Sequence, residues 1–175
     1  MNILITSSPG VGKTTLIKKV LTLYSGRVVG FYTEEIREVG RRRGFKIKVI
    51  GDTDNLKEGI LAHENFPGPI KVGRYGVNID EFERIGVLAL EGISDDNSLI
   101  IIDEIGKMEL HSDNFKRVVE NILNSPNLVL ATIGKIKNEF IEQIKARKDV
   151  MILELSYENR EKMPEKIINI LKRGI

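Results

Sequence analysis

Residues 7–14 carry a pattern that could bind a chain of phosphates. Their sequence, SSPGVGKT, matches G-x-x-x-x-G-K-[ST] at every fixed position except the first, where Ser7 replaces glycine. In such a loop, backbone N–H groups surround the phosphates, the lysine reaches the terminal phosphates and the next hydroxyl binds Mg²⁺. The pattern predicts a nucleoside-triphosphate site with Mg²⁺ as cofactor. The residues expected to hold phosphate are Ser8, Pro9, Gly10, Val11, Gly12, Lys13, Thr14 and Thr15.

The serine at the first position lies where a strand would turn into the loop. This corner is away from the amides that contact phosphate most closely, so a small residue such as Ser7 can fit with modest strain. The alternative is a lysine-containing turn that only imitates the motif. An apolar strand over 2–6 and a helix over 13–24 flank the loop and favour the phosphate-binding interpretation.

A second chemical candidate is the acidic pair that ends the apolar run 98–103. Asp103 is expected to hold Mg²⁺, usually through water, together with Thr14. Glu104 is expected to orient or deprotonate the attacking water. Acidic residues also end strands without any function, which is the alternative for both. In a chain with a phosphate-binding loop, the pair predicts metal-dependent hydrolysis.

Thr132 ends the apolar run LVLAT and is a third candidate for the catalytic set, with Lys13, Asp103 and Glu104. If its strand lies between the loop strand and the Asp-Glu strand, its hydroxyl can contact the terminal phosphate or the attacking water. Threonine is also common in strands for packing reasons alone. Its role therefore depends on the order of the strands.

Hydrolysis also needs positive charge on the transferring phosphoryl group. Arg74 and Arg160 are candidates because both lie in predicted loops, and the triplet Arg41, Arg42 and Arg43 is another, although charged turns are usually only solvated. Arg160 with Asn159 could instead flank the base, the guanidinium stacking on it. The sequence contains no N-K-x-D guanine motif, so we expect weak base discrimination. Two further groups could reach the site, but we expect surface ion pairs for them: Glu34, Glu35 and Arg37, and Lys107 and Glu109.

Apolar runs of strand length alternate with helical patterns through most of the chain. The expected strands are 2–6, 98–103, 128–133 and 150–155, and the expected helices are 13–24, a helix capped by Ser112, 137–147 and 164–173. This alternation predicts an α/β fold, mostly a parallel sheet with helices on both faces. Between the first helix and residue 98, we expect an inserted β-ribbon over about 27–52 with the arginine triplet in its turn. An irregular segment around a short strand (63–78) and a helix capped by Asn78 that runs to about Ile93 follow.

Length and composition exclude several classes of protein. The chain has 175 residues, of which 41% are hydrophobic and 30% charged, so we expect one globular domain over 1–175. The absence of cysteine excludes disulfides and thiolate metal sites, and a net charge of +2 does not favour a nucleic-acid partner. No apolar stretch approaches the roughly 20 residues of a membrane span, and no signal peptide is evident. We expect a cytoplasmic monomer that binds nucleoside triphosphates.

With these residues in view, the chain resembles the cancer-related nucleoside-triphosphatase family and its archaeal and bacterial counterparts. The similarity runs through PGVGKTTL, GFYTEEIR, VGRYGVN, IIIDEIGKMEL and the late ENR, nearly the whole chain. It implies slow, Mg²⁺-dependent hydrolysis of ATP, GTP and other triphosphates with little base discrimination. It also implies a RecA-like core in which the Thr132 strand lies beside the loop strand. Ser7 is the departure, since relatives usually have glycine there.

Two other functions use the same phosphate loop. A small-molecule or nucleotide kinase would transfer the terminal phosphate to an acceptor rather than to water. Glu104 next to Asp103 favours water activation, and no arginine-rich lid segment is evident. A nucleotide-gated RNA- or protein-binding module would use hydrolysis only to reset a contact made by the arginine triplet.

Overall fold

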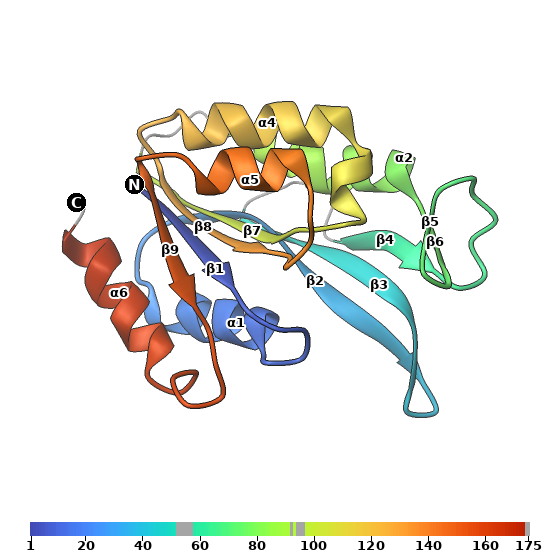
Figure 1. The fold of residues 1–175 in the computed structure, drawn as a ribbon, viewed down its shortest axis with the longest axis horizontal. Helices are drawn as coiled ribbons and strands as arrows, with labels where there is room; N and C mark the ends of the chain where they lie inside the picture. Colours follow the sequence, from blue (N-terminus) through green and yellow to red (C-terminus); the bar gives the residue numbers. More distant parts are fainter. Residues whose placement is uncertain (52–57, 92, 94–96, 174–175) are drawn as a thin grey trace.

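The computed structural model describes residues 1–51, 58–91, 93 and 97–173. The strands form one sheet in the order β5-β6-β4-β3-β2-β7-β8-β1-β9, with helices on both faces (Figure 1). The strands are β1 (Asn2–Thr6), β2 (Val28–Glu38), β3 (Arg41–Ile50), β4 (Glu58–His63), β5 (Lys71–Val72), β6 (Tyr75–Val77), β7 (Leu99–Ile105), β8 (Leu128–Ile133) and β9 (Val150–Glu154). The helices are α1 (Lys13–Leu23), α2 (Ile79–Phe82), α3 (Leu88–Glu91), α4 (Asp113–Leu123), α5 (Glu139–Lys145) and α6 (Met163–Arg173), with a π-helical turn η1 (Glu83–Val87) and a 3₁₀ turn η2 (Glu109–His111).

The parallel part of the sheet contains the strands that the sequence predicts to carry the site. β8 lies between β1 and β7 and is parallel to both. β9 adds to the other side of β1, and the first half of β2 adds to the other side of β7, again in parallel. The prediction that the Thr132 strand lies beside the loop strand is confirmed. The carboxyl ends of β1, β7 and β8 therefore meet at one edge of the sheet.

The predicted ribbon exists, but it is less separate from the core than the sequence indicates. β2 and β3 pair in antiparallel fashion, while residues Val28–Tyr32 of β2 also pair with β7. β2 is thus a core strand that continues into the hairpin projecting from the body in Figure 1. The turn is Val39–Gly40, so the prediction that the arginine triplet occupies it is wrong: Arg41 begins β3. The predicted end of the ribbon, residue 52, lies outside the described residues.

β4, β5 and β6 extend the sheet beyond β3 in antiparallel fashion. The sequence predicts only one short strand in this region. The helical segment after Asn78 is confirmed as α2, η1 and α3 in succession. α3 ends at Glu91, and Gly92, just before the predicted end at about Ile93, lies outside the described residues. The two predicted caps are confirmed, because the side chains of Asn78 and Ser112 accept hydrogen bonds from the Glu81 and Phe115 N–H groups. Asn138 caps α5 in the same way, one residue after the expected helix start, by accepting from the Ile141 N–H.

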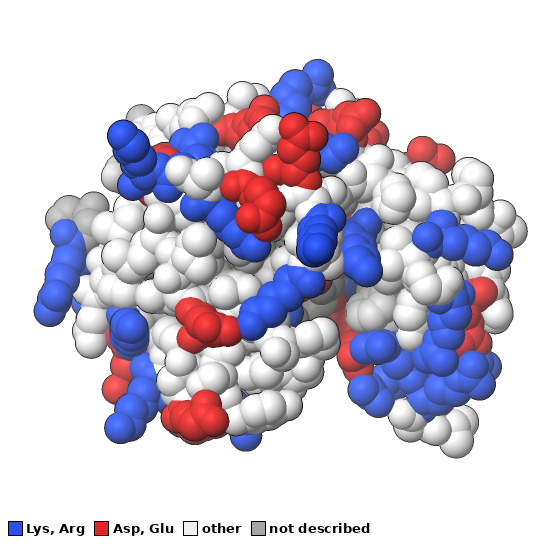
Figure 2. All heavy atoms as spheres, in the orientation of Figure 1, with Lys and Arg blue, Asp and Glu red and all other residues white. Residues whose placement is uncertain are grey.

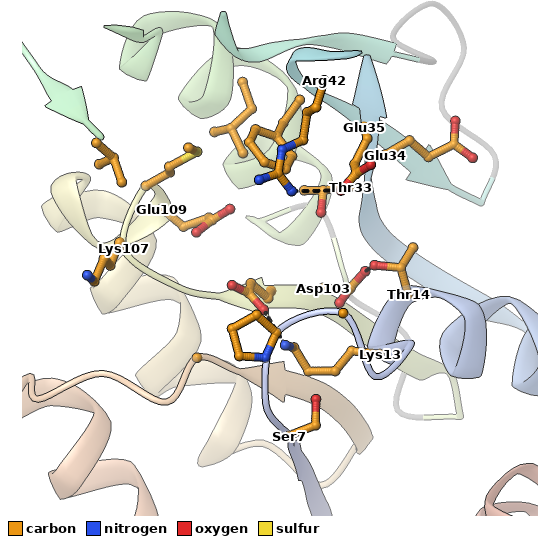
Figure 3. Close-up of a pocket in the computed structure, with 18 of the residues that line it drawn as sticks. Ser7, Lys13, Thr14, Thr33, Glu34, Glu35, Arg42, Asp103, Lys107 and Glu109 are labelled. Carbon is orange, nitrogen blue, oxygen red and sulfur yellow. Dashed lines mark hydrogen bonds and ion pairs between the residues drawn. The ribbon is translucent and has the colours of Figure 1, made fainter. Parts of the chain in front are cut away.

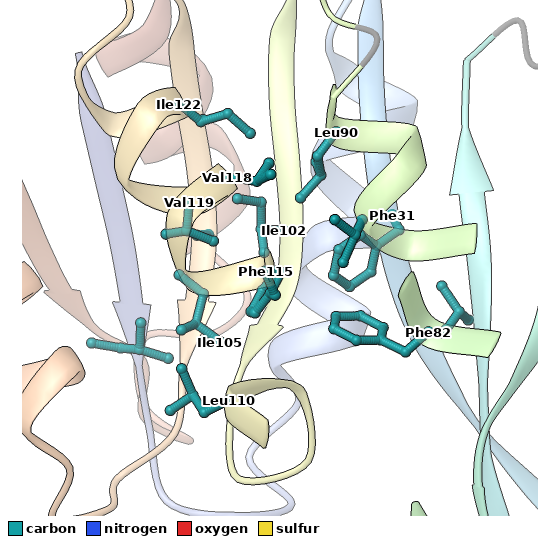
Figure 4. Close-up of a cluster of buried hydrophobic side chains, with 14 of the residues drawn as sticks. Phe31, Phe82, Leu90, Ile102, Ile105, Leu110, Phe115, Val118, Val119 and Ile122 are labelled. Atoms are coloured by element: carbon teal, nitrogen blue, oxygen red, sulfur yellow. The ribbon is translucent and has the colours of Figure 1, made fainter. Parts of the chain in front are cut away.

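Two apolar layers hold the helices to the sheet. α1 and α6 pack on one face, and α2, α3, α4 and α5 cover the other (Figure 1). The second layer contains three fully buried aromatic rings, Phe31 of β2, Phe82 of α2 and Phe115 of α4 (Figure 4). Their ring centroids lie 5.0–6.1 Å apart, two of the pairs edge-on. Such pairs add to the stabilisation from burial and fix α4 and α2 over β7, the strand that carries Asp103.

Within the described ranges, no helix combines the length and the apolar character that crossing a bilayer requires.

Candidate active site

The phosphate-binding loop connects β1 to α1 at the edge where the parallel strands end. Gly10 and Gly12 have φ angles of 81° and 113°, which glycine adopts readily and other residues do not. Gly12 also precedes the first residue of α1, Lys13, so the loop ends at the positive end of a helix of eleven residues. Loop and helix together present the geometry that surrounds phosphates with N–H donors.

Ser7 fits its position without a strained backbone. Among the described residues, Val39 is the only non-glycine residue with a positive φ, so Ser7 has a conformation open to any residue. Its side chain is buried, and the hydroxyl donates a hydrogen bond of 2.9 Å to the carbonyl of Ser8. The serine thus occupies the corner as a small residue with a satisfied hydroxyl.

Asp103 lies at the centre of the site, between hydroxyls from two other elements. The Thr14 hydroxyl donates to one carboxylate oxygen at 2.6 Å, and the Thr132 hydroxyl donates to the other. Asp103 and Thr132 each follow the Ile102–Ala131 pair of the two parallel strands, at the point where the register shifts. Burial raises the pKa of Asp103 to about 6, although both hydroxyl hydrogen bonds lower it.

These oxygens fit a magnesium ion. Mg²⁺ prefers hard oxygen ligands and is usually held by one or two protein groups together with waters and substrate phosphates. The Thr14 hydroxyl and the Asp103 carboxylate lie within hydrogen-bond distance of each other beside the loop, and a buried carboxylate gains from a cation. Thr14 and Asp103 are therefore the residues that could hold the metal.

Lys13 and Glu104 face each other across the loop. The Lys13 ammonium lies 3.4 Å from a Glu104 carboxylate oxygen, and the Glu104 side chain is 32% exposed. Glu104 can therefore reach water, while Lys13, at 14% exposure, points into the cavity. The structure brings Lys13, Thr14, Asp103, Glu104 and Thr132 together, as the sequence predicts.

The Thr132 side chain is fully buried, and its hydroxyl donates to Asp103. Contact of Thr132 with the terminal phosphate or the attacking water stays a prediction. The observed contact orients the Asp103 carboxylate from behind.

Glu109 belongs to the site, and the prediction of a surface ion pair is wrong for it. Glu109 is 4% exposed, and Figure 3 shows its carboxyl group turned into the cavity. Gly106 makes room for this, since a Cβ there would lie 2.6 Å from a Glu104 carboxylate oxygen and 3.0 Å from one of Glu109. Burial, with the nearby charge of Glu104, raises the pKa of Glu109 to about 8. η2 is a single turn without periodicity, so no sequence signal distinguishes this glutamate from a surface one.

The cavity has a volume of about 960 Å³ and extends from the loop to the β2–β3 hairpin. Charged side chains of the hairpin line it, namely Glu34, Glu35, Arg37 and Arg42, and so does Lys107. All of these except Arg42 were expected in surface ion pairs only. Several of their charges are paired: Glu35 receives hydrogen bonds from Arg37 at 2.7 Å and Arg42 at 2.8 Å.

Of the candidate arginines, Arg42 lines the cavity and the others do not. Arg42 also donates to the Tyr75 hydroxyl at 3.1 Å. Arg74 donates to the same hydroxyl and to the carbonyl of Arg42, and Arg41 and Arg43 pair with Glu64. These contacts tie the arginines to the hairpin and its neighbours rather than to the phosphate loop.

Asn159 and Arg160 lie in the β9–α6 connection and are not among the residues that line the cavity. Asn159 holds the turn, since it donates to the carbonyl of Glu154 and accepts from the Ser156 N–H, both at 2.9 Å. The Arg160 guanidinium lies over the Tyr157 ring, 5.4 Å from its centroid. The connection adjoins α1 through a 2.7 Å ion pair of Lys19 with Glu161, and contact with the base stays a prediction.

The chain is similar to known proteins along nearly its whole length. A sequence profile described as NTPase matches residues 2–168. A protein of Thermotoga petrophila named nucleoside-triphosphatase THEP1 is 51% identical over 172 residues, which are 98% of this chain and 93% of that protein. The crystal structure of THEP1 from Aquifex aeolicus superposes with a TM-score of 0.86 at 38% identity, covering 98% of this chain and 99% of that one. The solution structure of a human cancer-related nucleoside triphosphatase gives a TM-score of 0.82 at 34% identity, covering 98% and 97%.

Proposed function

Because the chain belongs to the NTPase family and is a nucleoside-triphosphatase, we propose that the cavity beside Lys13 hydrolyses ATP, GTP and other nucleoside triphosphates to diphosphate and phosphate. The reaction is Mg²⁺-dependent, slow, and discriminates little between bases. The observation that carries this proposal is the meeting of the Thr14 hydroxyl, the Asp103 carboxylate and the Lys13–Glu104 pair at the mouth of one loop.

Each of these groups has a task in the proposed mechanism. The N–H groups of the loop and the Lys13 ammonium bind the phosphates, and Thr14 and Asp103 hold Mg²⁺. The ion, when bound, neutralises charge that develops on the phosphate oxygens. Thr132 keeps the Asp103 carboxylate oriented through its buried hydrogen bond.

Glu104 accepts the proton of the attacking water. Lys13 exchanges its contact with Glu104 for phosphate oxygens when a triphosphate binds, which leaves the carboxylate free to accept a hydrogen bond from water. Glu104 is partly exposed, so water can reach it on the cavity side. A positioned general base contributes roughly 10²–10⁴ in rate.

The positions of the arginines support the proposal of slow turnover. An arginine on the transferring phosphoryl group is worth roughly 10³–10⁵ in rate. Of the described residues that line the cavity, Arg37 and Arg42 are the arginines, and both are paired with Glu35. Without an arginine on the phosphates, turnover is expected at about 10⁻² s⁻¹ or below.

Steady-state phosphate release from ATP, GTP, CTP and UTP, with Mg²⁺ and with EDTA, tests the proposal. We expect comparable slow turnover of all four and its loss in EDTA. With γ-labelled ATP and a set of candidate acceptors, label on an acceptor instead of free phosphate would contradict hydrolysis and support a kinase.

A further inference from the structure

A second hollow of about 720 Å³ adjoins the cavity of the active site. Three segments line it: β5 with the turn that follows, the residues from Lys107 through η2, and the β8–α5 connection. Its basic residues are Lys71, Lys107, His111, Lys135 and Lys137, and we call it the basic pocket. Figure 2 shows lysine and arginine side chains gathered where Figure 1 places the space between the β8–α5 connection and β5–β6.

The charges of the basic pocket are largely uncompensated. None of the described residues that line it is Asp or Glu. Lys135 pairs with Glu154 at 2.6 Å, whereas Lys71, Lys107 and Lys137 have no ion pair within 4.0 Å in the described part of the chain. Elsewhere in the described part of the chain Lys18 and Lys19 are paired, whereas the exposed Lys166 and Lys172 of α6 are not. Gathering like charges around one hollow is unfavourable unless an anion binds there.

The basic pocket shares part of its lining with the active-site cavity. Lys107 and Lys135 line both hollows, together with Val72, Gly73 and Ile136. Gly134, which precedes Lys135 in the sequence, lines the active-site cavity, and so does Glu104. An anion in the basic pocket would therefore lie beside the nucleotide, on the side of Glu104.

We propose that the basic pocket binds a second ligand, a phosphorylated small molecule, next to the nucleoside triphosphate. Several lysines from separate segments suit a ligand that carries phosphate groups, because each ammonium can donate to a different oxygen. The volume lies within the range of small-molecule sites, roughly 300–1,000 Å³. Single-stranded nucleic acid is less suited, because its binding usually combines basic grooves with aromatic stacking, and no Phe, Tyr or Trp is among the described lining residues.

Calorimetry with fructose 1,6-bisphosphate and inorganic phosphate as probes tests this site, with fructose as the uncharged control. The protein is first saturated with Mg²⁺ and the non-hydrolysable analogue AMPPNP, so that the phosphate loop is filled. The informative variant is Lys71→Glu with Lys137→Glu, since both residues line the basic pocket and not the active-site cavity. Lys166→Glu with Lys172→Glu on α6 is the matched control, because both lysines are exposed and the change in charge is the same.

We expect the bisphosphate to bind, fructose not to bind, and the Lys71/Lys137 variant to lose at least about tenfold in affinity while the α6 control keeps it. Absence of heat with both phosphate probes at millimolar concentration would overturn the proposal, as would equal affinity in the Lys71/Lys137 variant. If the variant does not fold by circular dichroism, Lys71→Gln with Lys137→Gln replaces it.

Two further experiments distinguish this proposal from nucleic-acid binding and from the proposed hydrolysis. An oligothymidylate that displaces the bisphosphate and binds more than about tenfold tighter at physiological salt would assign the pocket to nucleic acid and overturn the proposal. The same titration without AMPPNP keeps the test independent of the proposed hydrolysis: bisphosphate binding that depends on Lys71 and Lys137 supports the basic pocket even in a protein that hydrolyses nothing.

Discussion

Replacing Glu109 by glutamine removes a buried carboxyl and keeps its shape. The residue is 4% exposed, and its carboxyl shares the space beside Gly106 with Glu104. A carboxyl whose pKa is raised by folding holds its proton more tightly in the folded protein than in the unfolded chain. Its contribution to stability is present below the unfolded pKa, near 4.5, and is lost as the pH rises through the folded value of about 8. Glutamine has no such dependence.

The size of the effect follows from the pKa. One pKa unit corresponds to about 1.36 kcal/mol, so a rise from 4.5 to about 8 changes the free energy of unfolding by on the order of 4 kcal/mol between pH 5 and pH 9. Because the residue is buried, solvent screening reduces this little. We expect Glu109→Gln to be close to wild type at pH 5 and more stable than wild type by a few kcal/mol at pH 9.

Urea unfolding of metal-free protein in EDTA at pH 5, 7 and 9 measures the difference. Glu120→Gln on the exposed face of α4 serves as the control and should track wild type at all three values. A constant offset between Glu109→Gln and wild type across this range would refute the conclusion that the Glu109 carboxyl is buried and protonated in the folded protein.

Three further substitutions test other parts of the site. Lys13→Ala should weaken Mg·ATP binding by about tenfold or more and lower turnover as well, measured by calorimetry and phosphate release; loss of turnover alone would remove Lys13 from binding. Thr132→Val deletes the buried hydroxyl that donates to Asp103, and should raise the Mg²⁺ concentration for half-maximal activity by about tenfold; an unchanged Mg²⁺ titration would show that Asp103 needs no such support. Ser7→Gly should leave the affinity for Mg·ATP within about threefold, since the Ser7 backbone is unstrained; tightening by more than about tenfold would show that serine distorts the loop.

The parts of the fold that sequence predicts well are those with local signals. β1, β7, β8 and β9 are continuous apolar runs, and the helices between them carry apolar residues at helical spacing, with Ser112 as the cap of α4. β4, β5 and β6 were harder to predict from the sequence, because they are short. Their position depends on the pairing of β4 with β3 and of β6 with β4 and β5. The double role of β2 was also hidden, since pairing with β7 is a contact between segments about seventy residues apart.

The candidate site divides along the same line. Lys13, Thr14, Asp103 and Glu104 were predictable because motif spacing and strand ends place them, and parallel strands bring their carboxyl ends together. Glu109 was not, because its burial depends on a single 3₁₀ turn that folds back over Gly106. The sequence could not show which arginine reaches the phosphates. Its charge shows that a side chain can bind phosphate, but its partners in the fold decide where it points. Arg42, held by Glu35 and Tyr75, shows this.

The central claim is that Glu104 activates water for attack on a triphosphate bound at Lys13. Glu104→Gln keeps the size of the side chain and removes its basicity, so the direct test is to measure Mg·ATP affinity and single-turnover hydrolysis on the same preparation. We predict affinity within about threefold of wild type and hydrolysis slower by roughly 10²–10⁴. Hydrolysis at the wild-type rate in this variant would contradict the mechanism.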